Sequence, residues 1–112
     1  MSAPYPWQVG DFHRAVAEKR LVQAENWLGY VRKHRAEYPY YDDTWVAHCE
    51  LELFESYCNM ARITGATVNW GHARRVAEES LTIFHRRIRL IQLERVSGIK
   101  LEEIQVIPLP GS

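Results

Sequence analysis

The 112-residue sequence has few cysteines, no long apolar run and no excess of charge of either sign. No apolar run approaches the roughly 18 residues that a membrane-spanning helix requires. Lysine and arginine together number 14, as do aspartate and glutamate, so the formal net charge is zero. That balance implies no whole-molecule attraction to nucleic acid or to an anionic membrane. The first residues have neither the basic start nor the apolar stretch of a signal peptide, so we expect a cytoplasmic protein without a membrane role.

The two cysteines support the same expectation. Cys49 and Cys58 are nine residues apart in a segment with a helical pattern. At about 100° per residue they point to opposite faces of a helix and cannot pair with each other. Unpaired thiols are typical of a reducing compartment.

Enzyme signatures are also missing. There is no glycine-rich phosphate loop and no Gly-x-Ser-x-Gly elbow. The triplet from His48 to Glu50 resembles the His-x-Glu of zinc deaminases, but the Pro-Cys-x-x-Cys partner motif is absent. His48 and Glu52 share a helix face, yet a di-iron bundle requires Glu-x-x-His motifs, which the sequence lacks. We interpret His48, Glu52 and Glu55 as a solvated acidic face, and expect no catalytic residue, no metal and no cofactor.

What the sequence does contain is helical periodicity. A first helix is predicted from a cap at Asp11 to about Tyr38, and Pro39 ends it because the residue before a proline avoids the helical region. The apolar pattern changes phase near residues 18–20, which indicates a bend or break there. The buried stripe repeats at steps of four and three residues. Its members are Ala17, Leu21, Ala24, Leu28, Val31 and Tyr38.

A second helix is predicted over residues 42–64. Asp42 is the expected cap, and Tyr41 and Val46 occupy the two positions of a hydrophobic staple around it. Gly65 is the expected terminator because glycine adopts the left-handed conformation without strain. The inward stripe of this helix comprises Val46, Cys49, Leu53, Tyr57 and Met60.

A third helix is predicted from a cap at Asn69 to Gly98, followed by an apolar tail. Short connections make consecutive helices antiparallel. The expected fold is therefore all-α, an antiparallel bundle of three long helices with an apolar C-terminal tail. We expect one helical domain over residues 1–112, with an N-terminal arm at 1–10 and the tail at 99–112.

An alternative is carried by the segments FESYCNMARITG and NWGHARRVAEESL. Their small residues Ala73, Ala77 and Ser80, the following Leu81, and Gly65 at the turn are similar to one tetratricopeptide helix pair. The resemblance implies tetratricopeptide-like helical hairpins. It covers one hairpin, requires four extra residues in the turn, and has no clear second copy, whereas such repeats need about three for stability.

The charges are unevenly distributed. Residues 42–64 carry five acids against one arginine, a net of −4, and residues 66–98 carry six arginines against three glutamates, a net of +3. A basic helix face could contact phosphates, so a nucleic-acid-associated accessory protein is the alternative function. The zero net charge and the acidic neighbouring helix do not favour it. The candidate phosphate-contacting residues are Arg74, Arg75, Arg86, Arg87 and Arg89.

Aromatic residues gather at the first predicted corner, where Tyr38, Tyr40, Tyr41 and Trp45 lie close in sequence. One interpretation is that they cover the end of a narrow bundle, because tyrosine and tryptophan keep a polar atom for water. The other is a contact surface, because these residue types are enriched at protein interfaces. The sequence leaves both interpretations open.

A second apolar stripe on the third predicted helix favours association. Val76, Ile83 and Leu90 are seven residues apart, a spacing suited to a facing helix. The hypothesis is a small non-enzymatic helical protein that acts by protein–protein association, as a homodimer or as a subunit or adaptor of a larger complex. The competing possibility is that the tail, residues 99–107, folds back over this stripe within one chain.

Overall fold

The structure is a computed structural model that describes residues 6–110, with side chains from residue 12 onward. The described residues form α1 (Pro6–His34), α2 (Asp43–Thr64), α3 (Val68–Glu78), α4 (Ile83–Ser97) and the short 3-10 turn η1 (Leu101–Glu103), with no strand among them. The prediction of an all-α fold is confirmed.

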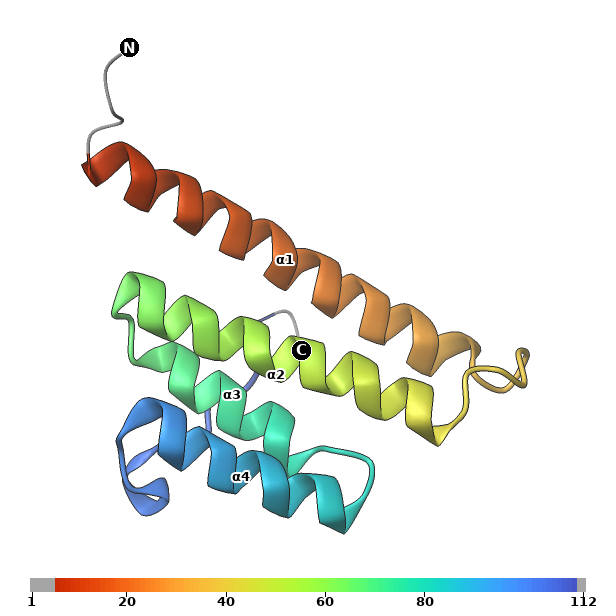
Figure 1. Cartoon of the computed structure of the whole chain (residues 1–112). Coiled ribbons are helices and arrows are strands. Elements are labelled where there is room, and N and C mark those ends of the chain that lie inside the picture. The colour runs from red at the N-terminus through yellow and green to blue at the C-terminus, as the bar shows by residue number, and fades with distance from the viewer. Residues whose placement is uncertain (1–5, 111–112) are drawn as a thin grey trace.

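The helices pack as a series of antiparallel hairpins around α2. Figure 1 shows α1 on one side of α2 and the α3–α4 pair on the other. Among the described helices, α1 packs against α2 alone, whereas α2 also contacts α3 and α4. The largest fully buried side chains include Phe54 and Tyr57 of α2 and Leu93 of α4. The core therefore lies on both sides of α2, which is the central element.

The expectation of three long helices is not confirmed, because the segment predicted as one third helix forms two. Residues 79–82 separate α3 from α4. The Ser80 hydroxyl donates to the carbonyl oxygen of Val76 at 3.1 Å, and the Thr82 hydroxyl accepts from the backbone N–H of His85 at 3.1 Å. Serine and threonine side chains compete with the helical backbone in this way. Thr82 is thus the cap of a new helix.

The bounds of the first helix also differ from the prediction. It begins at Pro6 rather than at Asp11, so residues 6–10 of the expected N-terminal arm are helical, and residues 1–5 of that arm lie outside the described part. Proline suits a first helical position because its missing N–H would have no partner there. The helix is continuous through residues 18–20, without the expected break, and ends at His34, four residues before Tyr38.

The second helix is bounded as its local signals predict. The Asp42 side chain accepts from the backbone N–H of Trp45 at 3.0 Å, and both staple positions, Tyr41 and Val46, are buried. Gly65 ends the helix with φ +72°, in the left-handed region.

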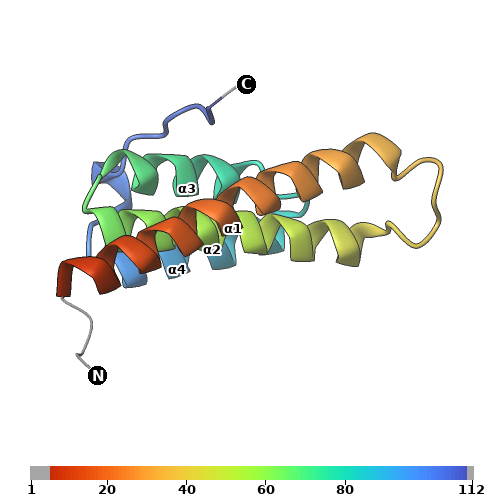
Figure 2. The ribbon, with the colours of Figure 1, turned by 90° about the horizontal axis from the view of Figure 1, so that it is seen from above.

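The C-terminal segment is held against α3. The backbone N–H of Ile107 donates to the carbonyl oxygen of Gly71 at 3.2 Å. The Arg74 guanidinium donates to the carbonyl oxygens of Leu101 and Ile104 at 2.7 and 2.6 Å. Figure 2 shows the segment passing beside α3. It does not fold over the second apolar stripe in the way the sequence alternative required, since Ile83 is 63% exposed.

Candidate interaction surfaces

The four aromatic residues of the first corner come together in space. The ring centroids of Tyr40 and Tyr41 are 4.8 Å apart, those of Tyr38 and Tyr41 are 5.6 Å apart, and those of Tyr41 and Trp45 are 6.2 Å apart. Tyr41 is buried at the centre, and the other three rings are exposed. One ring therefore covers the core and three face solvent.

Two residues of α1 that the sequence prediction omitted extend this cluster. Trp27 and Tyr30 stack with centroids 5.7 Å apart and an interplanar angle of 5°, and Trp27 meets Trp45 edge-on at 6.5 Å. The available signal was a stripe at steps of three and four residues that leads through His34 to Tyr38. We call the six residues the aromatic corner. They are Trp27, Tyr30, Tyr38, Tyr40, Tyr41 and Trp45.

The two carboxylates beside the aromatic corner are already partnered. Asp42 caps α2, and the carboxylate of Asp43 accepts from the guanidinium of Arg35. Loss of hydration, and then the neighbouring tyrosines, raise the pKa of the Tyr41 phenol above its usual 10.0. The corner therefore presents neutral aromatic faces rather than free charges.

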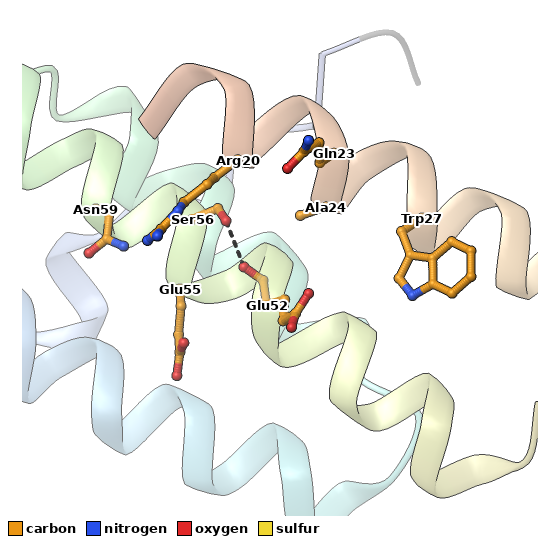
Figure 3. Close-up of a pocket in the computed structure, with 8 residues that line it drawn as sticks. All are labelled: Arg20, Gln23, Ala24, Trp27, Glu52, Glu55, Ser56 and Asn59. Carbon is orange, nitrogen blue, oxygen red and sulfur yellow. Dashed lines mark hydrogen bonds between the residues drawn. The ribbon is translucent and has the colours of Figure 1, made fainter. Parts of the chain in front are cut away.

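A groove of about 370 Å³ lies beside the aromatic corner, between α1 and α2 (Figure 3). Trp27 and Arg20 line it from α1, and Glu52 and Ser56 line it from α2. Two of its polar groups have local partners, because Glu52 pairs with His48 at 3.2 Å and the Ser56 hydroxyl donates to the carbonyl oxygen of Glu52 at 2.8 Å. The described hydrogen bond of the Ser56 hydroxyl therefore stays within its own helix.

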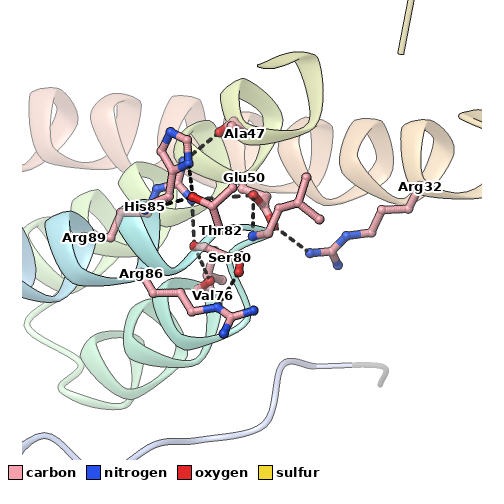
Figure 4. Close-up of polar contacts among 10 residues, drawn as sticks. Arg32, Ala47, Glu50, Val76, Ser80, Thr82, His85, Arg86 and Arg89 are labelled. Carbon is pink, nitrogen blue, oxygen red and sulfur yellow. Dashed lines mark hydrogen bonds and ion pairs between the residues drawn. The ribbon is translucent and has the colours of Figure 1, made fainter. Parts of the chain in front are cut away.

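A buried polar network lies on the other side of α2, between α2 and the α3–α4 connection (Figure 4). The Arg89 guanidinium donates to the Ser80 hydroxyl at 2.6 Å and to the carbonyl oxygen of Ala47 at 2.7 Å, and lies 3.6 Å from the Glu50 carboxylate. Arg32 of α1 approaches the same carboxylate at 3.3 Å. Burial lowers the pKa of Arg89, and the charge of Glu50 opposes that shift. In the described part of the chain, every buried side-chain nitrogen and oxygen has a hydrogen-bond partner, which is typical of a structural network.

The other candidate arginines are mostly committed to internal contacts as well. Arg74 holds the C-terminal segment, Arg75 pairs at 2.7 Å with Glu79 just after the end of α3, and the Arg86 guanidinium donates to the carbonyl oxygen of Ser80 at 2.6 Å. Within residues 6–110, Arg87 makes no hydrogen bond or ion pair. The structure does not assemble these residues into one free basic face.

Metal ligands do not gather either. Within the described residues, no group of three or more histidine, cysteine, aspartate or glutamate side chains is placed to hold a metal ion. The sequence candidates His48 and Glu52 form an exposed pair on one turn of α2.

The predicted apolar stripe is not one surface, because its members belong to different helices and differ in burial. Val76 lies on α3 and is buried, Leu90 is half-buried, and only Ile83 is exposed. A set of apolar side chains that shares only Ile83 with this stripe is exposed on α4, away from its buried residues Arg89 and Leu93. We call it the α4 outer face. It comprises Ile83, Phe84, Ile88 and Ile91, which are 63%, 67%, 45% and 61% exposed.

The thiols are inaccessible in the folded chain. Cys49 and Cys58 are free and buried, and burial raises the pKa of both, that of Cys58 to about 12. Because the thiolate is the reactive form, we expect Ellman's reagent to modify the native protein slowly at pH 8 and the urea-unfolded protein fully. Folding favours the protonated thiol, so this contribution to stability is present below pH 9.0 and is lost as pH rises toward 12. Fast modification of the native protein would contradict the buried placement.

No protein-family model matches the chain, and no curated protein or solved structure is significantly similar to it. The tetratricopeptide alternative therefore gains no support from these comparisons. A separate finding concerns hydropathy, since none of the described helices combines the length and apolar character needed to cross a bilayer.

Proposed function

We propose that the protein is a small non-enzymatic helical protein that acts by protein–protein association, as a homodimer or as a subunit or adaptor of a larger complex. The α4 outer face carries this proposal. Its apolar side chains follow one line along a helix, with Phe84, Ile88 and Ile91 at steps of four and three residues. Aligned apolar side chains of this kind mark a surface that meets another molecule.

The energetics favour a partner. Burial of one such side chain contributes about 1.5–3 kcal/mol relative to exposure in water. The described elements that pack on α4 are α3, α2 and η1, and α4 lies at the edge of the molecule (Figure 1). Two unpartnered arginines, Arg87 and Arg95, lie on the same side of the helix, and arginine is enriched at protein interfaces.

The aromatic corner supports the same class of function. Exposed tyrosine and tryptophan rings supply large contact area at low entropic cost, and they are enriched at binding hot spots. The free thiols are compatible with a cytoplasmic location as part of the proposal. The nucleic-acid alternative is not favoured, because three of its five arginines, Arg74, Arg86 and Arg89, bond to backbone carbonyls elsewhere in the chain and Arg75 pairs with Glu79.

Site-specific photo-crosslinking in the cells that produce the protein tests this proposal. A photoreactive phenylalanine analogue is placed at Phe84 or at Ile91, and a control analogue replaces exposed Lys19 on α1. We expect discrete crosslinked species, with the same chain or with another protein, from the two α4 positions and not from the control. Crosslinking from the α4 positions at the level of the control would overturn the proposed role of this face.

A further inference from the structure

The α4 outer face continues beyond its last isoleucine. Phe84, Ile88, Ile91 and Arg95 follow one another at steps of four, three and four residues, which keeps them on one line of the helix. We propose that this line is self-complementary and packs antiparallel against α4 of a second copy of the chain, around a twofold axis. The inference rests on the proposed function, since it names the partner of the same surface.

The charges beside the line set the direction of pairing. Arg87 and Glu94 are seven residues apart and lie on the same edge of the line. In an antiparallel twofold pair, each edge meets the same edge of the second copy in reverse order. Arg87 then faces Glu94 of the second copy, and the pair forms twice. A parallel arrangement would instead place the two Arg95 side chains in one layer, where their like charges repel.

Both edge groups are available for this contact. Arg87 is exposed and makes no hydrogen bond or ion pair within residues 6–110. Glu94 is also exposed, and the backbone N–H of Leu101 occupies only its Oε2 atom, at 2.8 Å. The Oε1 atom is left to accept from a guanidinium.

The same register fills the interface. When the twofold axis passes between Ile88 and Ile91, Ile88 of each copy faces Ile91 of the other copy. Phe84 then faces Arg95 of the second copy, and a guanidinium over a phenyl ring is a favourable cation–π contact. One register therefore produces three kinds of contact: an apolar centre, a cation–π contact at each end and an ion pair along the edge. Agreement among the three is what we expect of an interface between two copies.

A basic amphipathic helix can also lie on an anionic membrane. The observations favour a second copy, because Glu94 places an acid on the edge of the face and anionic headgroups would repel it.

Charge reversal in the full chain tests the register. We expect the wild-type protein to sediment as a dimer at ~100 μM, and Arg87→Glu or Glu94→Arg each to raise the dimer dissociation constant about tenfold or more, because each change makes two like-charge contacts. The double variant Arg87→Glu/Glu94→Arg restores opposite charges across the axis and should return the constant close to the wild-type value. Lys33→Glu, an exposed reversal on α1, is the matched control and should leave the dimer unchanged. Circular dichroism verifies that each variant is folded.

The outcomes separate this inference from the proposed function. A wild-type monomer at ~100 μM overturns self-pairing, while crosslinking of α4 to another protein would still support association. A double variant as weak as the two single changes combined overturns the antiparallel register. A monomer that binds anionic phospholipid vesicles, and loses that binding in Ile91→Glu, overturns the inference and assigns the face to a membrane.

Discussion

Replacement of Arg89 by methionine is expected to lower the free energy of unfolding by about 3–5 kcal/mol, because it leaves a buried carboxylate without its buried cation. Glu50 is 1% exposed, and Arg89 is the only fully buried cation among the described residues that approaches it. The change also removes the donor to the carbonyl oxygen of Ala47. Arg32 still reaches the carboxylate from a half-exposed position, so the lower end of the range is expected. Urea unfolding at pH 7, followed by circular dichroism, measures the loss.

A second variant distinguishes a lost ion pair from a general packing defect. In Glu50→Leu/Arg89→Met both charges are absent, and apolar replacement of a whole buried pair is often close to neutral. We therefore expect the double variant to recover much of the stability that Arg89→Met loses. Arg14→Met, which removes an exposed pair with Glu18, is the matched control and should cost less than about 1 kcal/mol. A double variant no more stable than Arg89→Met would show that the charge of Glu50 is not the cause.

This network explains why the break between α3 and α4 could not be predicted from the sequence. The backbone N–H of Leu81 donates to Glu50 at 3.2 Å, and Ser80 accepts from Arg89, so the connection is held by α2 and by the following helix. A local periodicity contains no information on such distant partners. The ends of α2 could be predicted, by contrast, because Asp42 and Gly65 act on backbone groups within their own turn.

The same break explains the error in the association surface. The predicted third helix runs through residues 79–82 without a break. The helix faces that it assigns to the residues after 82 are therefore wrong, because α4 starts anew at Ile83. The predicted stripe joined Val76 to Ile83 and Leu90, but Val76 is buried, and α4 exposes Phe84, Ile88 and Ile91 beside Ile83. The four aromatic residues Tyr38, Tyr40, Tyr41 and Trp45 could be grouped correctly because they follow each other closely along the chain. The arginines of the predicted basic face could not be interpreted from the sequence for another reason, since a sequence shows which residues are charged but not which groups they contact.

Gly71→Ala is expected to destabilise the protein by about 1–3 kcal/mol, because a side chain there has no room. An added Cβ would lie 2.5 Å from the carbonyl oxygen of Gln105 and 2.6 Å from side-chain atoms of Ile107. The carbonyl oxygen belongs to the backbone, so the C-terminal segment has to shift and to weaken the hydrogen bond between the Ile107 N–H and Gly71. Hydrogen exchange should accelerate at residues 105–109, and urea unfolding measures the loss of stability.

Gly29→Ala is the matched control, because it makes the same change in another helix. No described atom outside its own helix lies within 4 Å of a Cβ added there. Alanine restricts the unfolded chain and suits a helix interior, so this variant should gain about 0.5–1 kcal/mol. Changes of the same sign at both positions would show that contact with the C-terminal segment does not decide the effect at Gly71.

Gly71→Ala also tests whether the C-terminal segment covers the apolar surface of α4. The segment is bonded to α3 through Gly71 and Arg74, and it leaves Ile83 and Phe84 exposed. Release of the segment should therefore leave the dissociation constant of the dimer within about twofold of the wild-type value, since the antiparallel α4 contact does not include it. Stronger association after release would mean that the segment shields the α4 outer face in the native chain. Because Gly71→Ala keeps every residue of the tail, it separates shielding from the loss of apolar residues that a truncation would cause.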